Sequence, residues 1–255
     1  VWSINIATTV LAILIWLVVH PVPQLTRRRT RTLLAAASII TILLPFASEG
    51  ILGVHRWISV AGLRLHASAI AAPLIILCVA TVATHRIGSA LAIGATAAGI
   101  LALQPDAAQT TSLAAACALV LVGARTEQMG KVGAGLALLF AISLGSFVRH
   151  DPLAPVAHVE GIFAVAASRG AVWAVMATIS LLLLPVPFFA AWHHPRRPIA
   201  LALGVYVSMT VLAPAWGTFP VPIMGYGASP ILGYFLALAV AVGRPTRNAV
   251  VISRR

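Results

Sequence analysis

Charged residues are scarce in this sequence. Asp, Glu, Lys and Arg together make up 9% of its 255 residues, whereas soluble domains carry about 25%. Hydrophobic residues account for 60% and fall in long runs between short polar links. This composition excludes an ordinary soluble domain and indicates a polytopic transmembrane helical protein of the all-α class.

Cysteine and acidic residues are also few. Cys78 and Cys117 are the two cysteines, and both lie inside apolar runs, so no disulfide framework or metal-ligand spacing is present. Five acidic residues stand against 17 Lys and Arg, giving a formal net charge of +12. A soluble protein so basic would suggest a nucleic-acid partner. Here the basic residues lie in the short links, where membrane topology requires them, and we expect no nucleic-acid partner.

Nine apolar runs are candidates for membrane spans, each of which needs about 20 mainly apolar residues. They cover residues 1–20, 33–47, 67–83, 87–103, 110–123, 132–148, 162–192, 199–213 and 230–242. The run 162–192 is longer than one span needs, and Pro185 and Pro187 are expected to end its regular helix. The first run lacks an Ala-x-Ala cleavage pattern and is interpreted as a span. We expect one integral-membrane domain over residues 1–255.

Positive charge is unequal between the two sides that alternating spans define. If the link containing Arg27 is cytoplasmic, most Lys and Arg residues fall on that side, as the positive-inside rule requires. The Glu49–Ser68 segment then lies at the outer face, and Val1 lies outside. Four of the five acidic residues also fall on or near the outer side: Glu49, Asp106, Asp151 and Glu160.

Four outer segments carry most of the polar and aromatic motifs. They read GVHRWISVAGLRLHAS from Gly53, LQPD from Leu103, HVEGIF from His158 and FPVPIMGYGASPIL from Phe219. In their order, and in their places relative to the spans, they resemble the SEDS family (shape, elongation, division and sporulation; RodA/FtsW-like proteins). That family shows an outer Arg-Trp-Ile loop, a Gln-Pro-Asp before a span, a His-Thr-Asp-Phe before a long span and a late Ser-Tyr-Gly-Gly loop. It usually has ten spans, of which the first would be absent here.

The resemblance implies a function in bacterial wall synthesis. A SEDS protein is a glycosyltransferase of the bacterial inner membrane that polymerises lipid II, an undecaprenyl-linked disaccharide, into peptidoglycan during cell division or elongation. It usually works beside a transpeptidase, a penicillin-binding protein. Two alternatives stay open: a non-catalytic scaffold that docks such a partner, and, less favoured for want of an internal repeat, a transporter of a lipid-linked precursor.

The resemblance also implies a general base. The family's His-Thr-Asp-Phe carboxylate, regarded as catalytic, corresponds to Glu160. Glycosyl transfer needs a group that takes the proton of the attacking hydroxyl, and cations that stabilise the diphosphate leaving group. A divalent cation is a conceivable cofactor for the second task. Glu160 can equally be a solvated acid near the positive end of a helix.

The outer segments supply further candidate site residues. Arg56 and Arg64 offer charge for a phosphate, and Trp57 offers an aromatic face for sugar or lipid, although Arg56 and Trp57 can also be interface anchors. Asp106 is expected to cap the helix that follows it. The candidates are, for substrate binding, Arg56, Trp57, Arg64, His158, Tyr226 and Ser229, and, for structure, Gln104, Pro105 and Asp106.

The sequence departs from the family pattern within this site. Glu160 replaces the usual Asp, and one methylene moves a carboxylate by about 1.5 Å, where a misplacement of about 1 Å can cost 100-fold in rate. The stretch from His66 to Ala69 lacks the glutamate that the family pattern has there. Ala167-Ser168-Arg169-Gly170 stands where the family usually has Glu-Glu-Leu-Gly, so two acids are lost and a cation is gained. Arg169 is expected either to snorkel to the outer surface or to meet an acid such as Asp106.

Overall fold

The computed structural model describes residues 2–19, 28–60, 62–124, 126–149, 151–191, 196–225 and 227–242. Its helices are α1 Trp2–Val19, α2 Arg28–Leu43, α3 Ala67–Ala83, α4 Ile87–Leu103, α5 Ala107–Gly123, α6 Met129–Val148, α7 Ile162–Ser168, α8 Ala171–Leu183, α9 Val186–Ala190, α10 Arg197–Leu212 and α11 Ala228–Val242. Short 3-10 helices, Leu44–Ala47 and Ala213–Ala215, extend α2 and α10. The strands β1 Trp57–Val60 and β2 Leu63–His66 form one hairpin.

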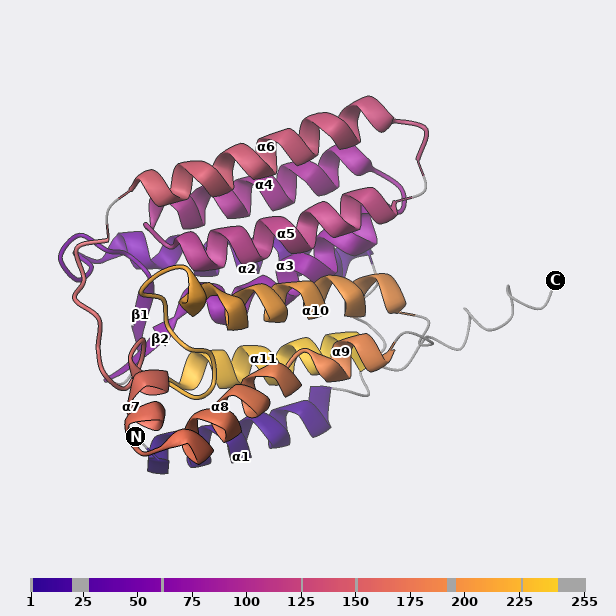
Figure 1. Cartoon of the computed structure of the whole chain (residues 1–255). Coiled ribbons are helices and arrows are strands. Elements are labelled where there is room, and N and C mark those ends of the chain that lie inside the picture. Colours follow the sequence, from indigo (N-terminus) through magenta and orange to yellow (C-terminus); the bar gives the residue numbers. More distant parts are fainter. Residues whose placement is uncertain are drawn as a thin grey trace.

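The predicted polytopic helical fold is confirmed. Within the described residues, four helical stretches are long and apolar enough to cross a membrane: Arg29–Ala47, Met129–Val148, Ala171–Ala190 and Arg197–Ala215. Five shorter apolar helices accompany them: Ser3–Leu17, Ala67–Ala83, Ile87–Leu103, Ala107–Gly123 and Ala228–Val242. Figure 1 shows these helices lying side by side, with their connections gathered at the two ends of the bundle.

The core is built around α3, which packs against α2, α4, α5, α10 and α11. Most of α3 is buried, whereas α8 buries only Ala177 among its residues. Outer helices present large apolar side chains to their surroundings, for example Phe140 of α6 and Trp173 of α8. A helix bundle in lipid has this distribution, because lipid tails are as apolar as the exposed side chains.

Small residues set the closest helix contacts. A Cβ atom added to Gly233 of α11 would collide with the carbonyl oxygen of Ala69 in α3. At Gly94 of α4, an added Cβ would lie 3.0 Å from the Sγ of Cys117 in α5. The backbones therefore approach closely where glycine is present, as is common between membrane helices.

The region 162–192 differs in part from the prediction. The expected interruption at the prolines is present, since α8 ends at Leu183 and Pro185 precedes α9. A second break separates α7 from α8 at Gly170, whose φ of 120° favours glycine. The prediction that Arg169 lies within a continuous apolar helix was wrong, because Arg169 lies exposed at this break.

All four motif segments meet at one end of the bundle, on the left in Figure 1. The hairpin, the turn between α4 and α5, the segment before α7 and the segment before α11 lie there. This end holds the candidate site.

Candidate active site

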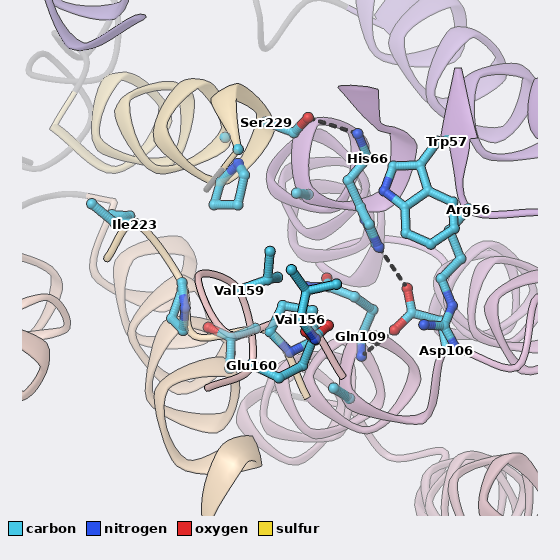
Figure 2. A pocket seen from close by; sticks show the side chains of 18 of the residues that line it. Arg56, Trp57, His66, Asp106, Gln109, Val156, Val159, Glu160, Ile223 and Ser229 are labelled. Atoms are coloured by element: carbon cyan, nitrogen blue, oxygen red, sulfur yellow. Dashed lines mark hydrogen bonds and ion pairs between the residues drawn. The ribbon is translucent and has the colours of Figure 1, made fainter. Parts of the chain in front are cut away.

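A cavity of about 420 Å³ opens among these segments. It runs from the hairpin and the segment before α7 down between α10 and α11 as far as Leu184, and most of its wall is apolar. Figure 2 shows polar side chains reaching into it from several elements. Such a cavity, apolar with a few placed polar groups, is typical of a ligand site. The polar and charged lining residues are Arg56, Arg64, His66, Asp106, Gln109, Asp151, Glu160, Tyr206, Thr210, Thr218, Ser229 and Tyr234.

The hairpin aims one of its faces at the cavity. Trp57 pairs with His66 across the strands, and Ser59 pairs with Arg64. Side chains alternate between the faces of a strand, so Trp57, Arg64 and His66 share one face, and all three line the cavity. The rings of Trp57 and His66 meet edge to face, with their centroids 5.8 Å apart.

Arg56 holds three segments together. Its Nε donates to the carbonyl oxygen of Gln104 at 3.2 Å, and its Nη2 donates to that of Pro105. The same Nη2 lies 2.7 Å from Oδ2 of Asp151. Arg56 is buried, with 6% of its side chain exposed. Its guanidinium group therefore interacts mainly with Asp151 and the two carbonyl oxygens. Gln104 is fully buried and donates from Nε2 to the carbonyl oxygen of Ile42.

Replacing Asp151 with asparagine removes the charge that faces Arg56. Because Asp151 is about one-third exposed, we expect a loss of about 1 kcal/mol of stability, equivalent to a fall of about 2–4 °C in Tm. Thermal unfolding in detergent measures it. The control is Glu127→Gln, which removes an exposed acid far from this pair. Equal Tm values for both variants and the wild type would contradict the role given to Asp151.

Asp106 serves two parts of the structure. Its Oδ1 accepts a hydrogen bond from the backbone N–H of Gln109 at 3.2 Å, which makes it the N-cap of α5. Its Oδ2 lies 3.4 Å from Nε2 of His66 and 3.5 Å from Oγ of Ser68. One oxygen thus caps a helix while the other faces the cavity wall.

His66 is the residue that sequence reasoning missed. Its Nδ1 lies 2.8 Å from Oγ of Ser68, and its backbone N–H donates to Oγ of Ser229 at 2.6 Å. Burial lowers the pKa of His66; the nearby Asp106 carboxylate opposes this shift and Arg56 adds to it. His66 is therefore neutral at pH 7. The signal available in the sequence was its spacing of two from Arg64, which puts both on one face of a strand.

Glu160 enters the cavity from the opposite side, from the turn before α7, as Figure 2 shows. Its Oε2 accepts a hydrogen bond from the backbone N–H of Val156 at 2.7 Å. Next to it, the carbonyl oxygen of Val159 accepts from the backbone N–H of Val221 at 3.2 Å. This bond joins the turn to the segment before α11, so the carboxylate has a defined place in the wall.

The structure brings most, but not all, of the predicted site residues together. Glu160, Arg56, Trp57, Arg64, Asp106 and Ser229 line the cavity. His158 is exposed and does not line it, and Tyr226 lies outside the described residues. Among the described residues, no three His, Cys, Asp or Glu side chains are close enough to hold a metal ion.

Two crystal structures of the rod shape determining protein RodA from Thermus thermophilus match this arrangement of helices. For the unaltered protein the TM-score is 0.68 and the identity 21%, over 94% of this chain and 85% of that one. A single-substitution mutant gives 0.68 and 20%, over 94% and 86%. The chain has the RodA fold.

The RodA fold confirms, at the level of architecture, the resemblance read from the four motif segments. Neither a protein-family model nor a curated protein sequence matches the chain. At 20–21% identity the likeness to RodA concerns the fold, so an activity has to be argued from the cavity itself.

Proposed function

We propose that this protein is a SEDS-type membrane glycosyltransferase that polymerises a lipid-linked disaccharide diphosphate such as lipid II. The observation that carries the proposal is the composition of one cavity. Its lining combines the cation of Arg64 and the carboxylate of Glu160 with a wall that is mostly apolar. A substrate with a sugar, a diphosphate and an isoprenoid chain presents groups that suit these three kinds of lining.

In the proposed reaction, Glu160 acts as the general base. Its carboxylate takes the proton of the acceptor sugar hydroxyl, and the hydroxyl oxygen attacks C1 of the donor sugar. The bond from C1 to the phosphate oxygen breaks, the glycosidic bond forms, and the lipid diphosphate leaves. Among the described residues, Val156 engages only one oxygen of the carboxylate, so the other remains to accept the proton.

The remaining lining residues have roles in binding. Arg64 is exposed toward the cavity and forms no ion pair among the described residues, so its charge is available to the diphosphate. Trp57 offers its ring to a sugar face, and Ser229 fixes the backbone at His66. Arg56, engaged by Asp151 and two carbonyl oxygens, contributes by holding the mouth in shape.

The proposal places the cavity at the outer face of the bacterial inner membrane. Basic residues on the other side of the alternating spans, including Arg86, Lys131 and Arg197, support this orientation under the positive-inside rule. A transpeptidase partner is part of the proposal, by the resemblance to SEDS proteins. The structural relative RodA is a rod shape determining protein, which supports a role in cell shape.

A polymerisation assay tests this function. The purified protein, with a cognate transpeptidase, is supplied with lipid II and a divalent ion, and the products are separated by size. We expect glycan chains. If none form under conditions where an active SEDS polymerase makes them, the protein is a scaffold rather than an enzyme. Movement of lipid II across vesicles without polymer would instead indicate a transporter.

Arg64→Gln is expected to weaken substrate binding. Loss of one charge-assisted hydrogen bond to a phosphate costs about 1.5 kcal/mol, or about tenfold in KM, with a smaller effect on kcat. Initial rates of polymerisation at several lipid II concentrations measure this change. Arg149→Gln is the matched control, because Arg149 is exposed at the same end of the bundle but does not line the cavity. An unchanged KM in Arg64→Gln would remove Arg64 from the site.

A further inference from the structure

Three polar side chains form a closed triangle in the cavity wall: His66, Ser68 and Asp106. The Ser68 Oγ lies 2.8 Å from His66 Nδ1 and 3.5 Å from Asp106 Oδ2, and His66 Nε2 lies 3.4 Å from that same oxygen. Ser68 is fully buried and Asp106 is 4% exposed. His66 and Asp106 line the cavity. Each member of the triangle therefore contacts both of the others.

With His66 neutral, the hydrogen bonds of the triangle have one consistent arrangement. A carboxylate oxygen has no proton to donate and repels the lone pair of an unprotonated ring nitrogen, so the ring proton belongs on Nε2, which lies 3.4 Å from Asp106 Oδ2. Nδ1 is then an acceptor, and the Ser68 hydroxyl donates to it. The carboxylate thus sets the tautomer of the ring.

The triangle can also take up one proton without losing a partner. With His66 protonated, its Nδ1–H donates to Ser68 Oγ, and the Ser68 hydroxyl turns to Oδ2 of Asp106, 3.5 Å away. In both states each of the three side chains keeps a polar atom of another within 3.5 Å. An unpaired polar group, which usually opposes a change of charge in a protein interior, is thereby avoided. Rotation of a single hydroxyl is the only rearrangement needed.

Protonation of His66 would change the charge that an anionic ligand meets at the mouth of the cavity. With His66 neutral, Asp106 leaves a negative charge in the wall, which repels an anion in the cavity. Arg56 offers little compensation, since Asp151 lies 2.7 Å from it. Protonation of His66 would cancel the charge of Asp106. The other titratable or charged groups that line this cavity are Arg64 on β2, Glu160 before α7, Tyr206 on α10 and Tyr234 on α11.

We propose that the His66–Ser68–Asp106 triangle is the proton-linked half of a diphosphate site, which binds the diphosphate of a lipid-linked ligand together with one proton from solvent. The negative charge of the ligand favours the imidazolium form, and the imidazolium form removes the repulsion of the ligand. Arg64 supplies the permanent positive charge of the site. This inference rests on the proposed function for the identity of the ligand, but the binding step does not require catalysis.

The proton linkage has a definite sign. The ligand-free His66 is neutral at pH 7, and a bound anion raises its affinity for a proton. Ligand affinity should therefore rise as pH falls, by up to about tenfold per pH unit while one proton is taken up. A site built only from arginine would show no such dependence on the protein side.

Calorimetry with farnesyl diphosphate as the probe tests the proposal. Binding to the purified protein is measured at pH 6, 7 and 8, in pairs of buffers with different ionisation heats, which report the number of protons taken up. We expect uptake approaching one proton in the wild type. His66→Gln should lose that uptake and the extra pH dependence, because the protonation of the ligand itself contributes equally to both proteins. The matched control, His85→Gln in the turn between α3 and α4, should behave as the wild type.

Ser68→Ala gives a second, independent readout. Without the hydroxyl, the protonated Nδ1 has no partner, so proton uptake should shift to lower pH while Nε2 still faces Asp106. Equal proton uptake by wild type and His66→Gln, or no binding of the probe, would overturn the proposal. If His66→Gln fails to fold, the proposal is tested by the number of protons that the wild type takes up and by the shift of that uptake to lower pH in Ser68→Ala. Proton-linked binding without any polymer would leave this site intact while refuting the polymerase function.

Discussion

Glu160→Gln is expected to lower the rate of glycan polymerisation by about 10²–10⁴-fold, the usual contribution of a general base. The amide cannot take the proton of the acceptor hydroxyl, although it can still accept the hydrogen bond from Val156. Folding and binding of the lipid-linked substrate should therefore persist. Initial rates of polymer formation, with Tm measured in parallel, separate the loss of chemistry from a loss of structure.

Two companion variants make the Glu160 result specific. Glu49→Gln removes another acid at the same end of the bundle, but Glu49 is exposed and does not line the cavity, so its rate should match the wild type. Glu160→Asp keeps a carboxylate and should retain more activity than Glu160→Gln. A normal rate in Glu160→Gln would transfer the role of base to another group, even if the enzyme function stands.

Gly233→Ala is expected to be the most destabilising single-methyl change in the helix core. The added Cβ meets the backbone oxygen of Ala69, and a backbone atom cannot turn aside as a side chain can. Separating α11 from α3 should cost about 3 kcal/mol, or about 6–12 °C in Tm. Because Gly233 also lines the cavity, polymerisation should fall with it.

Gly99→Ala in α4 is the matched control for Gly233→Ala. Nothing lies within 4 Å of a Cβ added at Gly99, and alanine favours a helix over glycine by about 1 kcal/mol. Its Tm should equal or exceed that of the wild type. A Gly233→Ala protein with the Tm of Gly99→Ala would show that α11 and α3 are not as close as described.

The helices could be predicted because short polar links separate the apolar runs of the sequence. The sequence His85-Arg86 separates α3 from α4, and Gln104-Pro105-Asp106 separates α4 from α5, and the predicted bounds of α3 and α4 match the structure. The break at Gly170 was missed because one glycine in an apolar run is compatible with a continuous helix. Only its positive φ reveals the turn that exposes Arg169.

The candidate site was only partly predictable, for a reason of geometry. The order of the motifs predicts that Arg56, Glu160 and Ser229 lie at one end of the bundle. It does not predict which side chains face the same cavity. Strand pairing decides that His66 faces the cavity beside Trp57. His158, in contrast, does not face the cavity, because the turn that directs Glu160 inward leaves the His158 side chain exposed. Local backbone direction, which spacing alone does not specify, separates the two histidines.

Photo-crosslinking to lipid II tests the central claim, that the lipid-linked substrate binds in this cavity. A benzoylphenylalanine is placed at Leu153, which lines the cavity, and in a second protein at Phe140 on α6, which is 65% exposed and outside it. Labelled lipid II is added in lipid nanodiscs with or without excess unlabelled lipid II. The account predicts a strong adduct at position 153 that the excess displaces, and only a weak, undisplaced one at position 140. Equal labelling at both positions, or labelling at 153 that the excess does not displace, would contradict it.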